Sequence, residues 1–364
     1  MPAMQLHWDI FCRVVDNYGD IGVCWRLARQ LAAEHGKRVR LWVDELTALA
    51  PLCPDCDPAR DEQFLAGIEL RRWPAADAAV NWAAAAKTAD VVIEAFACEL
   101  PGAYLQGLAR RERRPVWLNL EYLSAEAWVD GCHGMASPHP TLPLTKHFVF
   151  PGFTPSTAGL LREADACPAL PALSPQTLEI SLFCYDNAPV GGLFAALADL
   201  AQPVRCLVPP GKPLAATQAA LGAGSAWQLG RLQVEAIPFL SQTAYDALLR
   251  RCALNFVRGE DSFVRAQWAG RPFVWQIYRQ DDDAHLVKLD AFLARYLNGL
   301  PPATAATLRA LFFAWNGVGD PAPAIAAMLR RLPEFAIHAV DWRNSLKKQR
   351  DLASSLIQFC ADKV

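Results

Sequence analysis

The sequence predicts an α/β protein built from two similar halves that follow one another along the chain. Two alternations of short apolar strands with amphipathic helices follow one another along the chain, and a proline-rich stretch over 138–175 separates them. The chain has 364 residues, of which 53% are hydrophobic, and this length exceeds the usual extent of a single core. We therefore expect two parallel sheets, each covered by helices.

The first alternation starts with an apolar strand over 8–12, followed by a helix over 23–31 with apolar residues at helical spacing. Further strands are expected at 39–43, 68–71, 91–96 and 116–119, with a helix at 76–88. The repeated proline residues over 138–175 predict a loop and interdomain linker.

The second alternation predicts strands at 178–185, 204–208, 254–257 and 272–277, and helices at 191–200, 213–221, 245–251 and 262–269. Segments 324–332 and 342–361 read as closing helices. The expected division is a first domain over 1–165, a second over 166–340, and a closing helix over 341–364 with room to cross back to the first domain.

Composition excludes several classes of protein. A formal net charge of -2 provides no global basic field, which argues against nonspecific nucleic-acid binding but leaves a local basic patch open, and we expect no nucleic-acid partner. The sequence shows no secretory signal and no apolar stretch of membrane-spanning length, so we expect a cytoplasmic protein without membrane contact. The 11 cysteines are scattered among apolar strands and read as reduced core thiols. Cys53 and Cys56 form the only C-x-x-C pair, and with no second pair at zinc spacing we expect no metal there.

The loop after the first strand places two carboxylates, Asp16 and Asp20, around a turn allowed by Gly19 and Gly22. In open α/β sheets, the loops at the carboxyl ends of the strands border the ligand site. Asp20 has an equally probable structural interpretation as a helix cap. Asp16 lies too far upstream to cap the same helix, so the pair indicates a cation to be held or a proton to be removed.

In the second half, Arg258 to Asp261 is expected to form a loop before a helix that opens at Ser262. Backbone N–H groups at such a helix start favour a phosphate, and the Arg258 guanidinium adds further donors. Ser262 reads equally as a simple N-cap or as a phosphate donor. Glu260 and Asp261 either hold sugar or ribose hydroxyls or the incoming acceptor, or they are solvated loop acids.

Three weaker patterns complete the candidate site. Phe239 and Gln242 lie in an expected loop and suit a flat pyrimidine, through stacking and edge hydrogen bonds. The acids at 281–283 precede a helix, and we favour a cap over a metal cluster. The side chains of Asn119, Glu121 and Tyr122 follow a strand end and are expected on the acceptor side.

Five long segments resemble one family, the bacterial protein-arginine rhamnosyltransferases that modify translation elongation factor P. They are WDIFCRVVDNYGDIGVCWRLARQLA, ADVVIEAFACELP, WLNLEYLSAE, FPGFTPSTAGLLRE and RGEDSFVRAQWAGRPFVWQIY, and the resemblance runs from Trp8 to the C-terminal helices.

This resemblance implies a GT-B glycosyltransferase with two Rossmann-like domains facing a central cleft. It implies inverting transfer of L-rhamnose from dTDP-β-L-rhamnose to an arginine of elongation factor P. We expect no cofactor or metal, because the helix N–H groups and Arg258 can already stabilise the diphosphate. The nucleotide is expected in the second domain and the acceptor protein at the first. The catalytic acids implied are Asp16, Asp20 and Glu260. The donor contacts expected are Asn17, Gly19, Tyr185, Phe239, Gln242, Arg258, Asp261 and Ser262.

The chemistry of arginine suits these residues. A guanidinium is protonated and delocalised at neutral pH, so it is a poor nucleophile. We expect Asp16 to orient the cation through charge-assisted hydrogen bonds, and Asp20 to accept the proton as the new C–N bond forms.

Other function classes stay open at this point. Another GT-B enzyme, either a small-molecule glycosyltransferase or a non-hydrolysing epimerase, would share the architecture. A nicotinamide-dependent oxidoreductase is disfavoured because the first loop lacks G-x-G-x-x-G. A noncatalytic scaffold would leave the two acid-bearing loops without a role.

Overall fold

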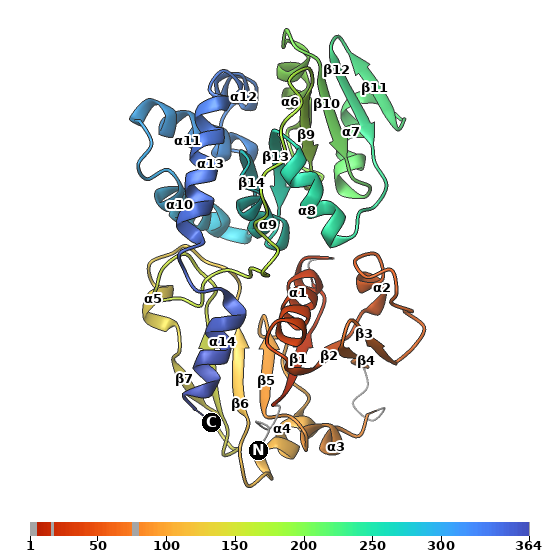
Figure 1. Ribbon diagram of the computed structural model, residues 1–364, viewed down its shortest axis with the longest axis vertical. Coiled ribbons are helices and arrows are strands. Elements are labelled where there is room, and N and C mark those ends of the chain that lie inside the picture. Colours follow the sequence, from red (N-terminus) through yellow and green to blue (C-terminus); the bar gives the residue numbers. More distant parts are fainter. Residues whose placement is uncertain (1–5, 16–17, 75–79, 364) are drawn as a thin grey trace. The chain divides into compact units, whose positions relative to one another are not determined.

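The computed structural model describes residues 6–15, 18–74 and 80–363 (Figure 1). The chain divides into two compact units. The first comprises residues 1–164 together with 349–364, and the second comprises 165–348. The expected boundary after residue 165 lies one residue from the observed division. None of the described helices has the length and hydropathy needed to span a lipid bilayer.

The first unit contains an eight-stranded sheet in the order β3-β4-β2-β1-β5-β6-β8-β7. All pairings are parallel except those of the edge strands β3 and β7. After β1 the chain adds strands on one side of the sheet, and from β5 onward it adds them on the other side. The strand order therefore reverses between the neighbours β1 and β5, which form a topological switch point. The strands are β1 (His7–Cys12), β2 (Arg38–Val43), β3 (Glu62–Leu65), β4 (Ile68–Arg72), β5 (Val91–Ala95), β6 (Val116–Leu120), β7 (Ala136–Pro138) and β8 (Thr145–Val149).

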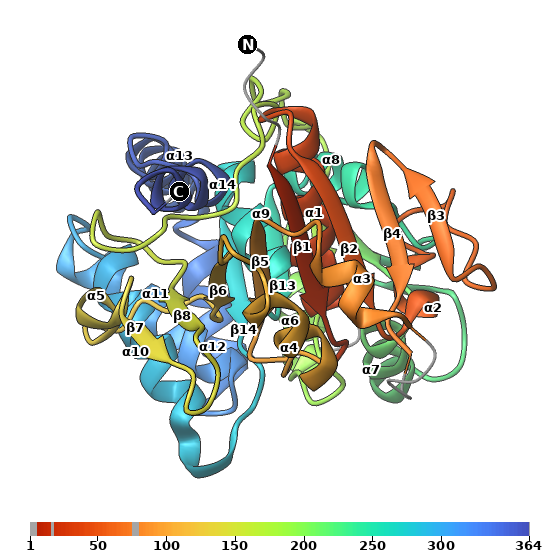
Figure 2. The ribbon, with the colours of Figure 1, turned by 90° about the horizontal axis from the view of Figure 1, so that it is seen from below.

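Helices cover both faces of this sheet, because its central strands are apolar on both sides. Ile10 and Cys12 pack in a core with α1 and α14, whereas Phe11 between them faces the core with α3 and α4. Figure 2 shows α3 and α4 beside the strands. The helices are α1 (Gly19–Ala33), α2 (Leu46–Leu49), α3 (Trp82–Ala86), α4 (Gly102–Ala109), α5 (Val129–Cys132) and α14 (Leu352–Ala361).

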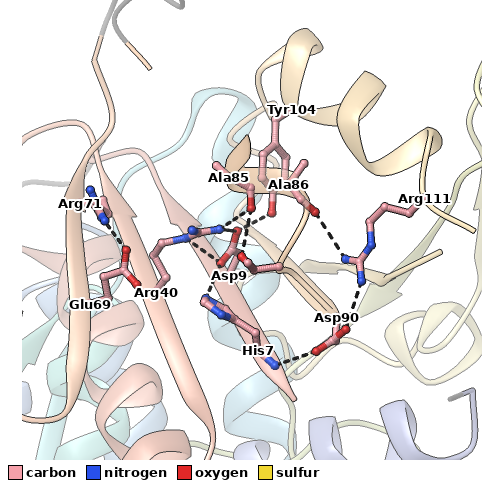
Figure 3. Close-up of polar contacts among 11 residues, drawn as sticks. His7, Asp9, Arg40, Glu69, Arg71, Ala85, Ala86, Asp90, Tyr104 and Arg111 are labelled. Atoms are coloured by element: carbon pink, nitrogen blue, oxygen red, sulfur yellow. Dashed lines mark hydrogen bonds and ion pairs between the residues drawn. The ribbon is translucent and has the colours of Figure 1, made fainter. Parts of the chain in front are cut away.

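A buried polar network crosses the face of the sheet covered by α3 and α4 (Figure 3). The guanidinium of Arg40 on β2 donates two hydrogen bonds to the carboxylate of Asp9 on β1, at 3.0 and 2.6 Å. The Tyr104 hydroxyl of α4 donates to the same carboxylate at 2.5 Å. These contacts satisfy a fully buried acid near the amino end of β1, and so tie α4 to the sheet.

The second unit contains a six-stranded sheet in the order β11-β12-β10-β9-β13-β14, parallel except for the β11–β12 pair. Its strand order reverses between the neighbours β9 and β13, as that of the first sheet does between β1 and β5. The strands are β9 (Leu178–Leu182), β10 (Val204–Val208), β11 (Ala226–Leu229), β12 (Leu232–Ala236), β13 (Leu254–Arg258) and β14 (Phe273–Gln276).

Aromatic packing joins the helices of this unit to β14. Phe292 of α10 contacts Phe263 of α9 edge to face with ring centroids 4.8 Å apart, and Phe273 of β14 lies 6.1 Å from Phe312 of α11. The helices are α6 (Val190–Ala198), α7 (Lys212–Leu221), α8 (Gln242–Arg251), α9 (Asp261–Ala269), α10 (Ala284–Tyr296), α11 (Pro302–Trp315), α12 (Pro321–Leu329) and α13 (Leu332–Leu346).

The structure corrects several element predictions. Residues 138–175 are not loop throughout, because β8 pairs with β6 and extends the first sheet. Proline is tolerated at the edge strand β7, which needs fewer backbone donors than a central strand. The expected helix over 76–88 is shorter, with α3 beginning at Trp82; residues 75–79 lie outside the described part of the chain.

The prediction of one closing helix over 341–364 is wrong, although the end of the chain does cross back to the first unit as expected. The chain forms α13 in the second unit, breaks, and then forms α14 in the first unit. The side chain of Asp351 accepts a hydrogen bond from the backbone N–H of Ser354, which caps a new helix after the break. Leu352 and Leu356 then bury their side chains in the core of the first unit.

Candidate active site

In the first unit, candidate residues lie at the carboxyl ends of β1, β5 and β6, beside the switch point between β1 and β5. Open α/β sheets bind ligands at such switch points. A pocket of about 650 Å³ opens at the same edge, lined by residues that include Arg13, Asp44 and Glu99. The topology therefore supports the expected location of a site in this unit.

Asp20 is buried in the first turn of α1, and its carboxylate is held by groups outside the helix. The backbone N–H of Val15 donates to one carboxylate oxygen at 2.9 Å, and the Tyr122 hydroxyl donates to the other at 3.2 Å. The N-cap position is Tyr18, which makes no side-chain capping bond. The alternative interpretation of Asp20 as a helix cap is therefore wrong.

The predicted glycine turn is also wrong. Gly19 and Gly22 both lie within α1, because the helix begins four residues earlier than the apolar spacing indicated. Asp16 and Asn17 lie outside the described residues, so their predicted roles stay predictions.

Polar and charged groups also cluster around β6, from this strand and its two neighbours β5 and β8. The Asn119 amide donates to the Glu121 carboxylate at 2.6 Å, while the indole of Trp117 donates to Glu94 at 3.1 Å. Lys146 forms an ion pair with Glu94 at 3.3 Å. Burial raises the pKa of Glu121 above its ordinary value, although the positive charge of Lys146 acts in the opposite direction. Asn119 and Glu121 thus lie at the strand end, as predicted.

In the second unit, Arg258 ends β13 and lies beside the residues that follow β9. Its guanidinium carbon lies 4.7 Å from the centroid of the Phe183 ring and 4.5 Å from that of Tyr185. Cation–π contacts of this kind orient a guanidinium without using its N–H donors. Arg258 and Tyr185 are therefore brought together at the second switch point, as the candidate donor site requires.

Ser262 holds the turn between β13 and α9. The backbone N–H of Arg258 donates to the Ser262 hydroxyl at 3.1 Å, and that hydroxyl donates in turn to the Arg258 carbonyl. The helix begins at Asp261 with Glu260 at the N-cap, where no side-chain capping bond forms. The N-cap interpretation of Ser262 is therefore wrong. Glu260 and Asp261 are half-buried at the start of α9.

Two further polar contacts fix the loop after β9. The side-chain carbonyl of Gln276 accepts a hydrogen bond from the backbone N–H of Tyr185 at 2.8 Å. The same Gln276 donates from its amide to the Asn187 side chain at 3.0 Å. The loop after β9 is thus held against the end of β14, and the Tyr185 ring is held next to Arg258.

Phe239 and Gln242 lie around the start of α8. Phe239 is 38% exposed, which leaves its ring accessible for stacking. Gln242 is buried and is the first residue of α8, not part of a loop as expected. Ser241 caps this helix by accepting a hydrogen bond from Ala244 N–H at 3.4 Å.

Sequence reasoning missed two side chains of this site, Phe183 and Lys212. The Lys212 ammonium lies 5.2 Å from the centroid of the Tyr185 ring, on the side of β10. Its signal was the segment PPGK directly after a strand, in which Gly211 has φ of 85° and turns the chain into α7. Together with Arg258 it places two cations around one aromatic ring.

Two neutral groups lie close to these cations. Burial raises the pKa of the Cys184 thiol to about 12, even though the charge of Arg258 opposes this shift. Burial also raises the pKa of Tyr245 well above its ordinary value. Both groups therefore stay uncharged at neutral pH and do not compete with an anionic ligand for these cations.

The residues considered as metal ligands in the sequence do not form a ligand cluster within the described part of the chain. Cys53 and Cys56 are free buried thiols, and no group of three or more potential ligands occurs among the described residues. The acids at 281–283 were expected to cap the following helix, but Asp283 at the N-cap makes no side-chain capping bond and has left-handed backbone geometry.

A family model described as "Elongation-Factor P (EF-P) rhamnosyltransferase EarP" matches residues 8–361. The chain belongs to this family. Membership identifies it as a glycosyltransferase, so the oxidoreductase and scaffold hypotheses are wrong. The resemblance noted in the sequence is confirmed.

Curated relatives match along nearly the whole chain. The protein-arginine rhamnosyltransferase of Pseudomonas putida KT2440 is 49% identical, covering 98% of this chain and 99% of the relative. The enzyme of the same name from Pseudomonas aeruginosa PAO1 is 48% identical with the same coverage.

Solved structures confirm the GT-B fold. A structure described as "Structural basis for EarP-mediated arginine glycosylation of translation elongation factor EF-P" is 34% identical, with a TM-score of 0.64, and covers 99% of this chain and 100% of that one. MurG of Acinetobacter baumannii is 14% identical with a TM-score of 0.51, covering 99% and 100% of the two chains, and shares the fold alone.

Proposed function

We propose that this protein transfers L-rhamnose from dTDP-β-L-rhamnose to an arginine side chain of translation elongation factor P, with inversion at the anomeric carbon. The observation that carries the proposal is the buried Asp20 carboxylate, held by two donors at the switch point of the first sheet. Since translation takes place in the cytoplasm, the proposed acceptor places the reaction there.

The donor is proposed to bind in the second unit. Arg258, Lys212 and the N–H groups at the start of α9 supply positive charge for the diphosphate, and they need no metal ion. The Ser262 hydroxyl holds the turn that presents these groups. Phe239 and Gln242 are proposed to contact the thymine, by stacking and by an edge hydrogen bond. Asp261 and Gly19 are proposed to contact the donor on its sugar side, and Glu260 is proposed as a further catalytic acid beside the sugar.

The acceptor is proposed to bind in the first unit. A nitrogen of the acceptor guanidinium attacks the anomeric carbon as the bond from that carbon to the diphosphate oxygen breaks. The electron pair of this bond leaves with dTDP, whose growing charge the cations of the second unit stabilise. Asp20 takes the proton released from the attacking nitrogen, and Asp16 is proposed to orient the guanidinium.

The test is to incubate the protein with elongation factor P and dTDP-rhamnose and to weigh the acceptor by mass spectrometry. We expect a gain of one deoxyhexosyl group on one arginine, unchanged in EDTA, and an inverted anomeric configuration by NMR. No mass gain on elongation factor P, with transfer to a small molecule instead, would contradict the proposal. Loss of turnover in EDTA that magnesium restores would overturn its metal independence.

A matched pair of variants tests the base. Asp20→Asn should lower turnover by about 10²- to 10⁴-fold, because general-base catalysis contributes that much. Asp130→Asn is the control, since its carboxylate also accepts a side-chain hydroxyl, from Thr154 at 2.6 Å, in the same unit. Turnover of Asp20→Asn within a few-fold of the wild type would remove Asp20 from the base role.

A further inference from the structure

A strained loop follows β5 next to Asp20. Phe96, Ala97 and Glu99 have positive φ angles of 56°, 52° and 57°. Residues with a side chain rarely adopt this left-handed geometry, and clustered strain of this kind is typical of binding and catalytic sites. The backbone N–H of Phe96 donates to the Leu120 carbonyl at 2.7 Å, so the strain is maintained by pairing with β6.

This loop directs the Phe96 ring onto Tyr122. The two rings are stacked, with centroids 4.4 Å apart and an interplanar angle of 16°. The Tyr122 side chain is 43% exposed, and its hydroxyl donates to the buried carboxylate of Asp20. The Tyr122 ring, with Phe96 packed on one face, thus lies next to the Asp20 carboxylate.

We propose that Phe96 and Tyr122 form the platform that binds the acceptor guanidinium, and that Tyr122 positions Asp20 for proton removal. The inference rests on the proposed function, because it names the residues that would receive the arginine. A planar guanidinium stacks well on an aromatic face and pairs with a carboxylate at its edge. Tyr122 and Asp20 present these two features side by side, joined by a hydrogen bond of 3.2 Å.

The platform assigns separate roles to ring and hydroxyl. The ring holds the acceptor, so its loss should raise the acceptor KM. The hydroxyl acts through Asp20, so its loss should lower kcat. Neither change should alter the affinity for dTDP, which the second unit is proposed to bind.

Three substitutions separate these roles. Tyr122→Phe should lower kcat about 10-fold, the value of one hydrogen bond to a charged group, with acceptor KM near that of the wild type. Tyr122→Leu should lower kcat similarly and also raise acceptor KM about 5-fold, as expected from a lost cation–π contact. Phe96→Leu should raise acceptor KM with kcat preserved.

Tyr104→Phe is the matched control. It removes a hydroxyl that also donates to a buried carboxylate in the same unit, that of Asp9. We expect it to lower the melting temperature while kcat and acceptor KM stay those of the wild type. Each variant is checked for dTDP affinity and melting temperature, so that a loss of fold is separated from a loss of function.

Wild-type kcat in Tyr122→Phe, or wild-type acceptor KM in Tyr122→Leu, would overturn the platform. If Asp20→Asn is inactive in the same assay, the proposed function survives this failure. If wild-type protein does not modify the acceptor at all, the proposed function itself fails.

Discussion

At the end of β13, the Arg258 side chain is fixed by two aromatic rings and its backbone by the Ser262 hydroxyl. Such a side chain loses little conformational entropy when it binds an anion, because its orientation is already set. The sequence placed the arginine at a strand end, but the stacking on Phe183 and Tyr185 depends on β9 and β13 being neighbours.

We expect Arg258→Ala to weaken dTDP binding about 10- to 100-fold, since a charge-assisted contact to the diphosphate is lost. Isothermal titration calorimetry measures the affinity. The control is Arg205→Ala on β10, whose guanidinium forms ion pairs with Glu179 and Glu235. Arg258→Ala with wild-type affinity would exclude it from the donor site.

Among the elements, β1 and β2 are joined by more than their backbone ladder, because Arg40 is committed to the buried Asp9 carboxylate (Figure 3). Desolvation lowers the pKa of Arg40, but the charge and hydrogen bonds of Asp9 outweigh it and the pKa of Arg40 is raised. Both side chains are nearly inaccessible, so removal of Arg40 would leave the buried Asp9 carboxylate without its guanidinium partner, with the His7 ring 3.3 Å away.

Arg40→Ala should therefore reduce the free energy of unfolding by about 3–5 kcal/mol. Chemical denaturation followed by tryptophan fluorescence gives this value. Arg71→Ala in the neighbouring strand β4 is the comparison, because its ion pairs with Glu62 and Glu69 both involve partners that solvent reaches. We expect about 0–1 kcal/mol there, and equal losses in both variants would show that the buried pair is not special.

For the whole molecule, the last helix decides how the chain is divided. α14 packs on α1, and the Leu352 N–H donates to the Leu160 carbonyl at 3.0 Å. The first unit therefore includes residues 349–364, which follow the whole second unit in the sequence. The blue end of the chain lies among red and yellow elements in Figure 1.

Leu356→Ala should reduce the free energy of unfolding by about 2–5 kcal/mol, since the side chain is fully buried in the first core. Ile337→Ala on α13 is the control, because that side chain is 68% exposed and should matter little. Differential scanning calorimetry resolves the transitions. A Leu356→Ala protein as stable as the control would contradict the assignment of α14 to this core.

The sequence by itself determined the class of fold, the central strands and the family. Strand β10 has the predicted bounds, and the strands on both sides of each switch point, β1 and β5 in one sheet and β9 and β13 in the other, were predicted, because buried parallel strands are short continuous apolar runs. Local spacing did not reveal β3, β11 or β12, which have only four or five residues each and contain polar side chains that interrupt an apolar run.

Only the tertiary structure decided which residues meet. Asp20 was singled out by its place after a strand, yet its partner Tyr122 lies 102 positions away in the chain. Stacking of Phe96 on Tyr122 and of Arg258 on Tyr185 likewise follows from strand order. The physical reason is that parallel sheets align the carboxyl ends of strands distant in sequence, and side-chain periodicity within one segment carries no information about that order.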